Sequence, residues 1–264
     1  MADDALAQDE RGRWTEGERL FASYLDEHGV SYRYEALEAA KKRPPDFTVD
    51  HPSCDPILFE VKDICTPLPT SSFFAYDPCA PIRTHIEAGT KKFREYRGRV
   101  CVLVLYGGNG FVNLSRPESI LGAMYGDMGW SIPFSPELGH FDSSKMEREF
   151  IKGRGKMVGK TTIRNTRIAA LLTLHNYDLA TLRNNRYIRL DDGRERSERV
   201  SDLLEERVFH PDEHHTGITV WENALAANRL PRDLFKDEMD DWWSVDGGYQ
   251  SHSFVGSKLR ELDF

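Results

Sequence analysis

Two acidic residues and a lysine occur in this 264-residue chain at a spacing that could support metal-dependent hydrolysis. Asp46 follows a proline, and thirteen residues separate it from the run Glu60, Val61 and Lys62. Side chains alternate between the two faces of a β-strand, so Glu60 and Lys62 are expected to point the same way. A hairpin that pairs the two segments would therefore bring both carboxylates beside one ammonium group.

Such a cluster has the groups that hydrolysis of a phosphodiester requires. Carboxylate oxygens are suitable ligands for Mg²⁺ or Mn²⁺, and the metal lowers the pKa of a bound water and neutralises charge in the transition state. The Lys62 ammonium could orient that water or stabilise the developing oxyanion. The alternative interpretation of Glu60 and Lys62 is a surface ion pair on an edge hairpin. The otherwise apolar strand around them disfavours it.

Periodicity predicts the elements that would position these residues. A helical stripe begins near Trp14 and ends at Gly29, and continuous apolar residues at 100–106 are typical of a buried central strand. On the strand that holds Glu60, the side chains of residues 57, 59 and 61 are expected to form the face toward the core. The predicted order is helix 14–29, strand 30–37, strand 46–49, turn 50–56, strand 57–64, a helix that includes Ile82 to Tyr96, and strand 100–106.

The second half of the chain is predicted in less detail. Residues 107–144 are rich in Gly, Pro and Ser and are expected to form an extended insertion. A short helix is predicted over 144–151, and buried strands over 168–174 and 218–221. Residues 1–13 are interpreted as a flexible tail and 14–264 as a single domain, with a core at 14–106 and an elaboration at 107–264.

The motif Pro45-Asp46 … Glu60-Val61-Lys62 resembles that of the PD-(D/E)XK nuclease superfamily. The resemblance implies an α/β, restriction-endonuclease-like core of helix, three-strand meander, helix and strand, followed here by a large C-terminal elaboration. It also implies that Asp46, Glu60 and the main-chain carbonyl of Val61 bind Mg²⁺ or Mn²⁺, and that Lys62 assists the attacking water. The activity implied is that of a metal-dependent nuclease.

The same resemblance implies two further site residues. They are a Glu in the first helix and a Gln or Lys in the helix after the hairpin. Glu18 is the candidate in the first helix. It has a second interpretation, because Thr15 and Glu18 form the pattern of a capping box. Lys92 is the candidate in the second helix. It is chosen over Lys91 because it directly precedes an apolar residue.

Charge is unevenly distributed along a chain of net charge −8. Residues 83–99 carry six basic and two acidic side chains, and residues 145–199 carry fourteen basic and seven acidic ones. Local basic surface can bind a polyanion even when the net charge is negative. The expected partner is nucleic acid, DNA in preference to RNA, with a homo-oligomer or protein partner left open. The competing interpretation is a set of solvated surface faces.

The basic block 145–199 contains a glycine-rich run, Gly155 to Thr161. It differs from a phosphate-binding P-loop because three residues separate its two glycines where four are required. We interpret it as a basic segment whose glycines allow close approach to a nucleic-acid backbone. Four scattered cysteines and the lack of an apolar membrane-length segment favour a cytoplasmic protein without membrane contact. The alternative to a nuclease is a catalytically silent nuclease-like domain that binds nucleic acid or a protein partner.

Overall fold

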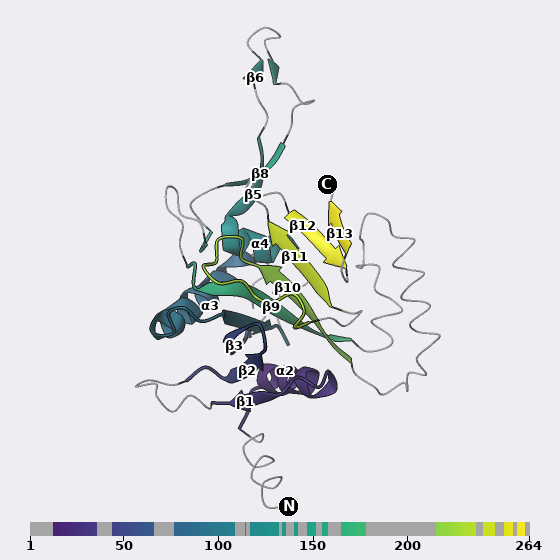
Figure 1. Cartoon of the computed structure of the whole chain (residues 1–264). Helices are drawn as coiled ribbons and strands as arrows, with labels where there is room; N and C mark the ends of the chain where they lie inside the picture. Colours follow the sequence, from purple (N-terminus) through teal and green to yellow (C-terminus); the bar gives the residue numbers. More distant parts are fainter. Residues whose placement is uncertain are drawn as a thin grey trace, which may run out of the picture.

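The structure, a computed structural model, places the chain in the mixed α/β class (Figure 1). A large mixed sheet forms its centre, and helices lie on both faces of that sheet. The structure describes residues 13–35, 44–65, 77–108, 114, 117–131, 134–135, 140–141, 147–151, 155–157, 165–177, 215–235, 240–245, 251–255 and 258–261. The predicted tail therefore lies, apart from residue 13, outside the described residues.

Nine of the described strands form one sheet in the order β1-β2-β3-β4-β9-β10-β11-β12-β13. The first three strands form an antiparallel meander, and β3, β4 and β9 are then mutually parallel. After β9 the neighbouring pairs are antiparallel except β10 and β11. The strands are β1 (Tyr32–Tyr34), β2 (Phe47–His51), β3 (Cys54–Asp63), β4 (Cys101–Tyr106), β9 (Ile168–Tyr177), β10 (His215–Glu222), β11 (Asp241–Val245), β12 (Ser251–Val255) and β13 (Lys258–Glu261).

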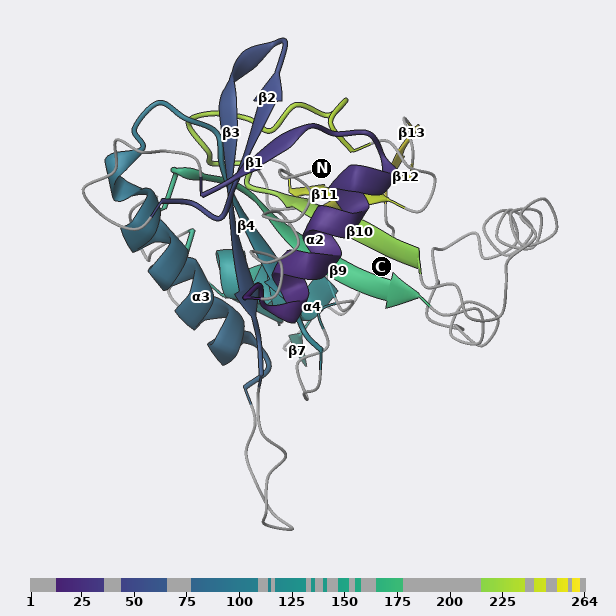
Figure 2. The same cartoon turned by 90° about the horizontal axis from the view of Figure 1, so that it is seen from below.

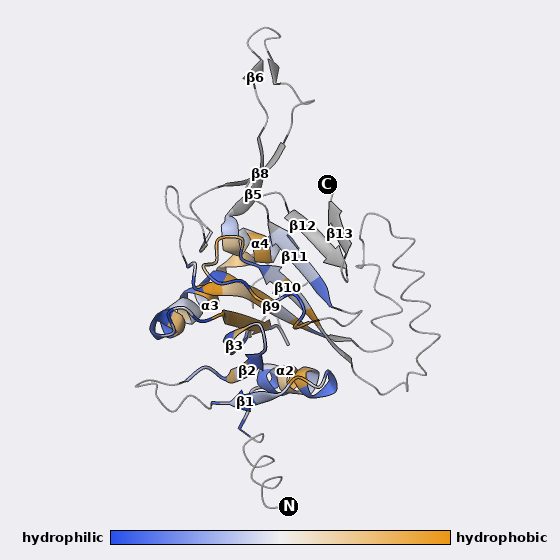
Figure 3. Cartoon of the chain, in the orientation of Figure 1, coloured by the Kyte–Doolittle hydropathy of each residue, from blue (hydrophilic) through white to orange (hydrophobic). Residues whose placement is uncertain are grey.

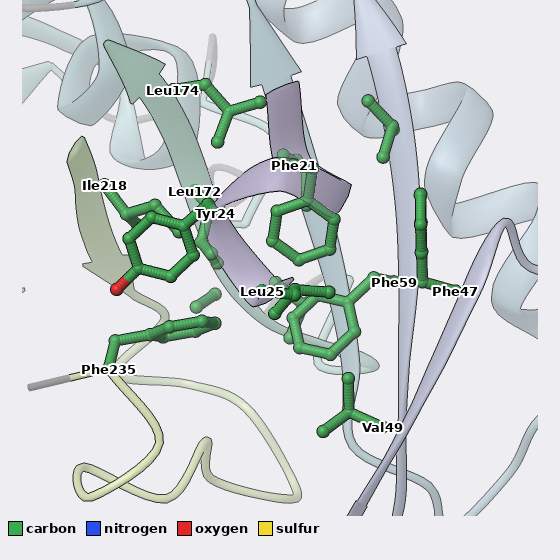
Figure 4. Close-up of a cluster of buried hydrophobic side chains, with 14 of the residues drawn as sticks. Phe21, Tyr24, Leu25, Phe47, Val49, Phe59, Leu172, Leu174, Ile218 and Phe235 are labelled. Atoms are coloured by element: carbon green, nitrogen blue, oxygen red, sulfur yellow. The ribbon is translucent and has the colours of Figure 1, made fainter. Parts of the chain in front are cut away.

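Three α-helices of the described residues cover the sheet, one on the first face and two on the second. Helix α2 (Glu16–Glu27) contacts β3, β4, β9 and β10 and lies across the first face (Figure 2). Its aromatic and aliphatic side chains pack against Phe47, Phe59 and Leu172 (Figure 4). Helices α3 (Cys79–Lys92) and α4 (Pro117–Tyr125) pack on the second face, and a 3₁₀ turn, η1 (Phe93–Glu95), follows α3.

The predicted order of elements from residue 14 to residue 106 is present, with one correction in the hairpin. Strand β3 begins at Cys54, so the turn shrinks from the predicted 50–56 to residues 52 and 53. The register shifts between Val49 and His51. Pro56 lies opposite this irregularity, where its missing N–H costs no regular ladder bond. Proline was thus a poor guide to the length of the turn.

A second correction concerns the face that carries Glu60. Residues 57, 59 and 61 form the predicted core face, but Leu58 is also buried, in the cluster beneath α3. Strand β4 is buried at all six positions for the same reason, since helices cover both sides of it. Figure 3 shows this apolar centre along the middle strands. The predicted acidic patch therefore lies under a helix and not on an open sheet face.

The second half of the molecule departs most from prediction. Within the predicted extended insertion 107–144, residues Pro117–Tyr125 form α4, which is largely buried. The predicted helix over 144–151 is wrong, because Glu147–Ile151 is strand β8, paired antiparallel with β5 (Asp127–Ser131). Together with β6 (Phe134–Ser135) and β7 (His140–Phe141), these strands form an arm that projects from the body (Figure 1).

The predicted strands over 168–174 and 218–221 are confirmed as parts of β9 and β10. Both strands extend the same sheet that contains the hairpin. Among the described helices none has the length and apolarity needed to cross a membrane.

Candidate active site

Asp46 and Glu60 lie side by side beneath α3. The antiparallel register pairs Phe47 with Phe59, so the residues directly before and after this pair, Asp46 and Glu60, face each other across the hairpin. Both residues are 2% exposed. The Oδ2 atom of Asp46 accepts a hydrogen bond of 2.7 Å from the main-chain N–H of Val61. This bond holds the Asp46 carboxylate against the main chain of β3 at Val61.

Two lysines neutralise this pair of buried carboxylates. Lys62 Nζ donates to Glu60 Oε1 at 2.5 Å, and Lys92 Nζ forms an ion pair with Glu60 Oε2. Lys92 also donates to Asp46 Oδ1 at 3.4 Å. Two negative and two positive side chains therefore meet in one small region. Removal of charges from water is costly unless they are paired in this way.

The arrangement raises the pKa of Glu60. Burial is the largest cause, and the neighbouring Asp46 carboxylate acts in the same direction. The ammonium groups of Lys62 and Lys92 oppose the shift. A cation placed between the two carboxylates would favour their ionised forms, as the lysines do here.

The position of α3 determines which basic residue reaches the site. Strands β3 and β4 are parallel, so the connecting helix runs in the opposite direction and its C-terminal end returns toward Asp46 and Glu60. Lys92 is in that last turn, whereas Lys91 is exposed. Gly89, one turn earlier, allows the helix to approach the sheet, because a Cβ there would lie 3.2 Å from Leu103 Cδ1. The geometry thus brings Lys92, and not Lys91, into contact with the acids.

Several buried polar atoms near Glu60 have no hydrogen-bond partner among the described residues. They are Thr48 Oγ1, Tyr96 Oη and Glu60 Oε2, the last of which has its ion pair with Lys92. The Glu60 carboxylate contributes to the raised pKa of Tyr96, after burial and nearer charges, so the phenol is within its electrostatic reach. Buried polar atoms of this kind are usually satisfied by water or a ligand. The site therefore fits a hydrated cation in the chemistry of its donors.

Metal binding would rest on few side chains. In the described part of the chain, no three His, Cys, Asp or Glu side chains gather as a metal-binding group. Asp46 and Glu60 provide two carboxylates, and Val61 is the next residue along β3. Mg²⁺ is commonly held by one or two carboxylates while it keeps several waters. Two carboxylates are therefore compatible with such an ion but would not form a closed cage around it.

Glu18 forms the capping box that was one of its two interpretations. Its carboxylate accepts from the main-chain N–H of Thr15 at 2.6 Å, and its own N–H donates to Thr15 Oγ1 at 3.3 Å. It also accepts from the Tyr34 hydroxyl at 3.4 Å. The pKa of Tyr34 is raised by burial and by nearby acids, which include Glu18 and Asp46. Tyr34 packs against Phe47 in the cluster beneath α2. No described hydrogen bond or ion pair joins Glu18 directly to Asp46 or Glu60.

The glycine-rich segment has a structural role where it is described. A Cβ on Gly155 would overlap the backbone of Tyr125 and Gly126, and Met157 is fully buried. Lys156 forms an ion pair with Glu87 of α3. Close approach at Gly155 is therefore to the chain's own backbone, which corrects our expectation for that glycine. The other cation of this segment, Lys160, lies outside the described residues.

One neighbour of the site was missed in the sequence. His85 is on α3, seven residues before Lys92, and its pKa is lowered by burial and then by the Lys62 ammonium. Its spacing from Lys92 corresponds to two helical turns on one side of the helix. That spacing was the signal that could have found it.

The chain has no significant match among protein-family models, curated proteins or solved structures.

Proposed function

We propose that the protein is a metal-dependent nuclease that hydrolyses phosphodiester bonds of nucleic acid, DNA in preference to RNA. Asp46, Glu60 and the carbonyl of Val61 would hold Mg²⁺ or Mn²⁺. When bound, the ion would lower the pKa of a water molecule and neutralise charge on the phosphate. Lys62 would orient that water or stabilise the transition state.

The observation that carries this proposal is the pairing of two buried carboxylates with two lysines. Asp46 and Glu60 are each 2% exposed, but the side chain of Lys62 is 32% exposed and that of Lys92 is 17% exposed. The two acids are therefore the most deeply buried groups of the cluster, and Lys62 is its most solvent-exposed side chain. A phosphate that entered on that side would meet cationic groups before it met the carboxylates.

The resemblance to the PD-(D/E)XK superfamily supports the same proposal. The antiparallel meander β1–β2–β3, the crossover through α3 and the parallel strand β4 agree with the restriction-endonuclease-like core that the motif implies. In this proposal β9 to β13 are the C-terminal elaboration of that core. Glu18 would act through Tyr34, or on a second water or ion, and Lys92 would contact the substrate phosphate once a cation occupies the carboxylates.

A silent nuclease-like domain is the second candidate, and one observation favours it. Each carboxylate oxygen of Asp46 and Glu60 already contacts a lysine or the Val61 N–H. A cluster neutralised in this way could be a structural element of a domain that binds nucleic acid or a protein without cutting it. The two candidates differ in whether a divalent ion binds at the carboxylates.

The decisive experiment compares cleavage of single- and double-stranded DNA and RNA in Mg²⁺, in Mn²⁺ and in EDTA. We expect cleavage only with metal, and its loss in Asp46→Asn and in Glu60→Gln, because a neutral amide is a poor Mg²⁺ ligand. Calorimetric titration of Mn²⁺ without substrate provides a readout besides activity. Glu222→Gln is a matched control, since Glu222 is buried and paired with Arg232 at 3.1 Å.

Two results would decide against hydrolysis. Full activity in either acid variant would remove these residues from the mechanism. Nucleic-acid binding without cleavage or Mn²⁺ uptake would favour the silent domain, and salt-dependent affinity would identify its ligand as a polyanion.

A further inference from the structure

The proposed reaction needs a group that accepts the proton of the attacking water. In the site as described, Asp46 and Glu60 are the ligands assigned to the cation. Among the described side chains, Lys62 and Lys92 are the two that contact these acids, and an ammonium group has no lone pair to accept a proton. The four contacting side chains therefore leave the role of proton acceptor open.

His85 is a half-buried residue on the same side of α3 as Lys92. It lies on α3 two turns, or about 10 Å along the helix axis, before Lys92. Helix α3 runs opposite to β3. The direction from Lys92 to His85 along the helix is therefore the same as the direction from Glu60 to Lys62 along the strand. Lys62 is the more exposed of the two lysines, so His85 is on the side from which substrate would enter.

We propose that His85 is a further catalytic residue, the general base of the phosphodiester hydrolysis. The inference rests on the proposed function. In the step, the water oxygen forms the new bond to phosphorus while the imidazole nitrogen takes one of its protons, and the bond between phosphorus and the leaving oxygen breaks. The leaving oxygen takes a proton from solvent, and the imidazolium later returns its proton to solvent.

The charges around His85 favour its neutral form, which a base requires. Partial burial and the Lys62 ammonium on β3 both lower the pKa of His85. On α3 itself, Arg83 is paired with Asp77 at 2.9 Å, and Glu87 is paired with Lys156. Neither acid is therefore an unpaired charge that would favour the imidazolium. His85 should be neutral, and able to accept a proton, throughout the physiological range.

The test is the rate of metal-dependent cleavage by His85→Ala and by the control Thr84→Ala, which replaces an exposed neighbour on α3. We expect His85→Ala to lower kcat about 100-fold, the usual lower effect of a general base, with Mn²⁺ affinity unchanged. Added imidazole should restore part of the lost rate in His85→Ala but not in Asp46→Asn. The wild-type rate should fall on the acid side as His85 becomes protonated, and that limb should be absent in His85→Ala.

The outcomes separate this inference from the proposed function. If the wild-type chain cuts and His85→Ala cuts equally fast, the inference is wrong and the nuclease assignment stands. A slow His85→Ala that imidazole does not rescue, and whose Mn²⁺ affinity has also fallen, would show a structural role and overturn the inference. If the wild-type chain cuts nothing in Mg²⁺ or Mn²⁺, both proposals fail.

Discussion

Replacement of Lys92 by methionine tests the charge balance of the site directly. The ammonium contacts Glu60 and lies 3.4 Å from Asp46, so Lys92→Met leaves two adjacent buried carboxylates with one cation. Breaking a buried ion pair costs about 3–5 kcal/mol. We expect about 3 kcal/mol, because Lys62 remains and the Lys92 side chain keeps some contact with solvent. For a chain of this size that corresponds to a fall in Tm of about 6–12 °C.

The destabilisation should depend on pH in a defined direction. The pKa of Glu60 is raised by burial and by Asp46, and loss of the opposing Lys92 should raise it further. A raised folded-state pKa means that the folded protein binds the proton more tightly than the unfolded chain. Stability is then lost as pH rises through the folded-state pKa. The difference in Tm between Lys92→Met and wild type should therefore be larger at pH 8 than at pH 5.

The assay is thermal unfolding followed by circular dichroism, in EDTA and over a series of Mg²⁺ concentrations. A cation that binds only the folded state raises Tm with its concentration. It should raise the Tm of Lys92→Met more than that of wild type, because it replaces the missing ammonium. The control is Lys91→Met, which removes an exposed charge from the same turn. Equal Tm values for the two variants in EDTA, with equal responses to Mg²⁺, would refute the reasoning.

Two further predictions concern Lys62, at the candidate site, and His175, on β9. Lys62→Ala should lower kcat more than it lowers Mn²⁺ affinity, since its proposed role is in the transition state; an unchanged rate with weakened Mn²⁺ binding would reverse that role. His175 contacts the hydroxyls of Thr173 and Thr219 at 3.1 and 3.0 Å, and burial lowers its pKa to about 4. The unfolded chain then binds the proton more tightly, so the free energy of unfolding should fall by up to about 3 kcal/mol as pH decreases from 6.5 to 4. Urea unfolding of wild type and His175→Gln checks this, and equal pH slopes would contradict it.

The amino-acid sequence by itself determined the residues of the hairpin and their common face. Asp46 and Glu60 are close in sequence, and the alternation along each strand sets which side chains share a face. The α2 helix and its capping box, and the buried β4, were also predictable, because caps and apolar runs are local signals. The sequence signals of these elements span only a few residues each, so one segment of the sequence is enough to show them.

Only the tertiary structure decided what lies above and around that hairpin. The strand β8 pairs with β5 across the intervening residues that hold β6 and β7, and no local pattern in its charged sequence distinguishes that pairing from a helix. The short α4 could not be assigned from its composition, because its burial comes from the sheet beneath it. The contact of Lys92 with the acids, the position of His85 and the burial of Leu58 all depend on how α3 docks. The position of α3 on the sheet is set by packing between segments that are distant in sequence. The periodicity of one segment therefore cannot predict it.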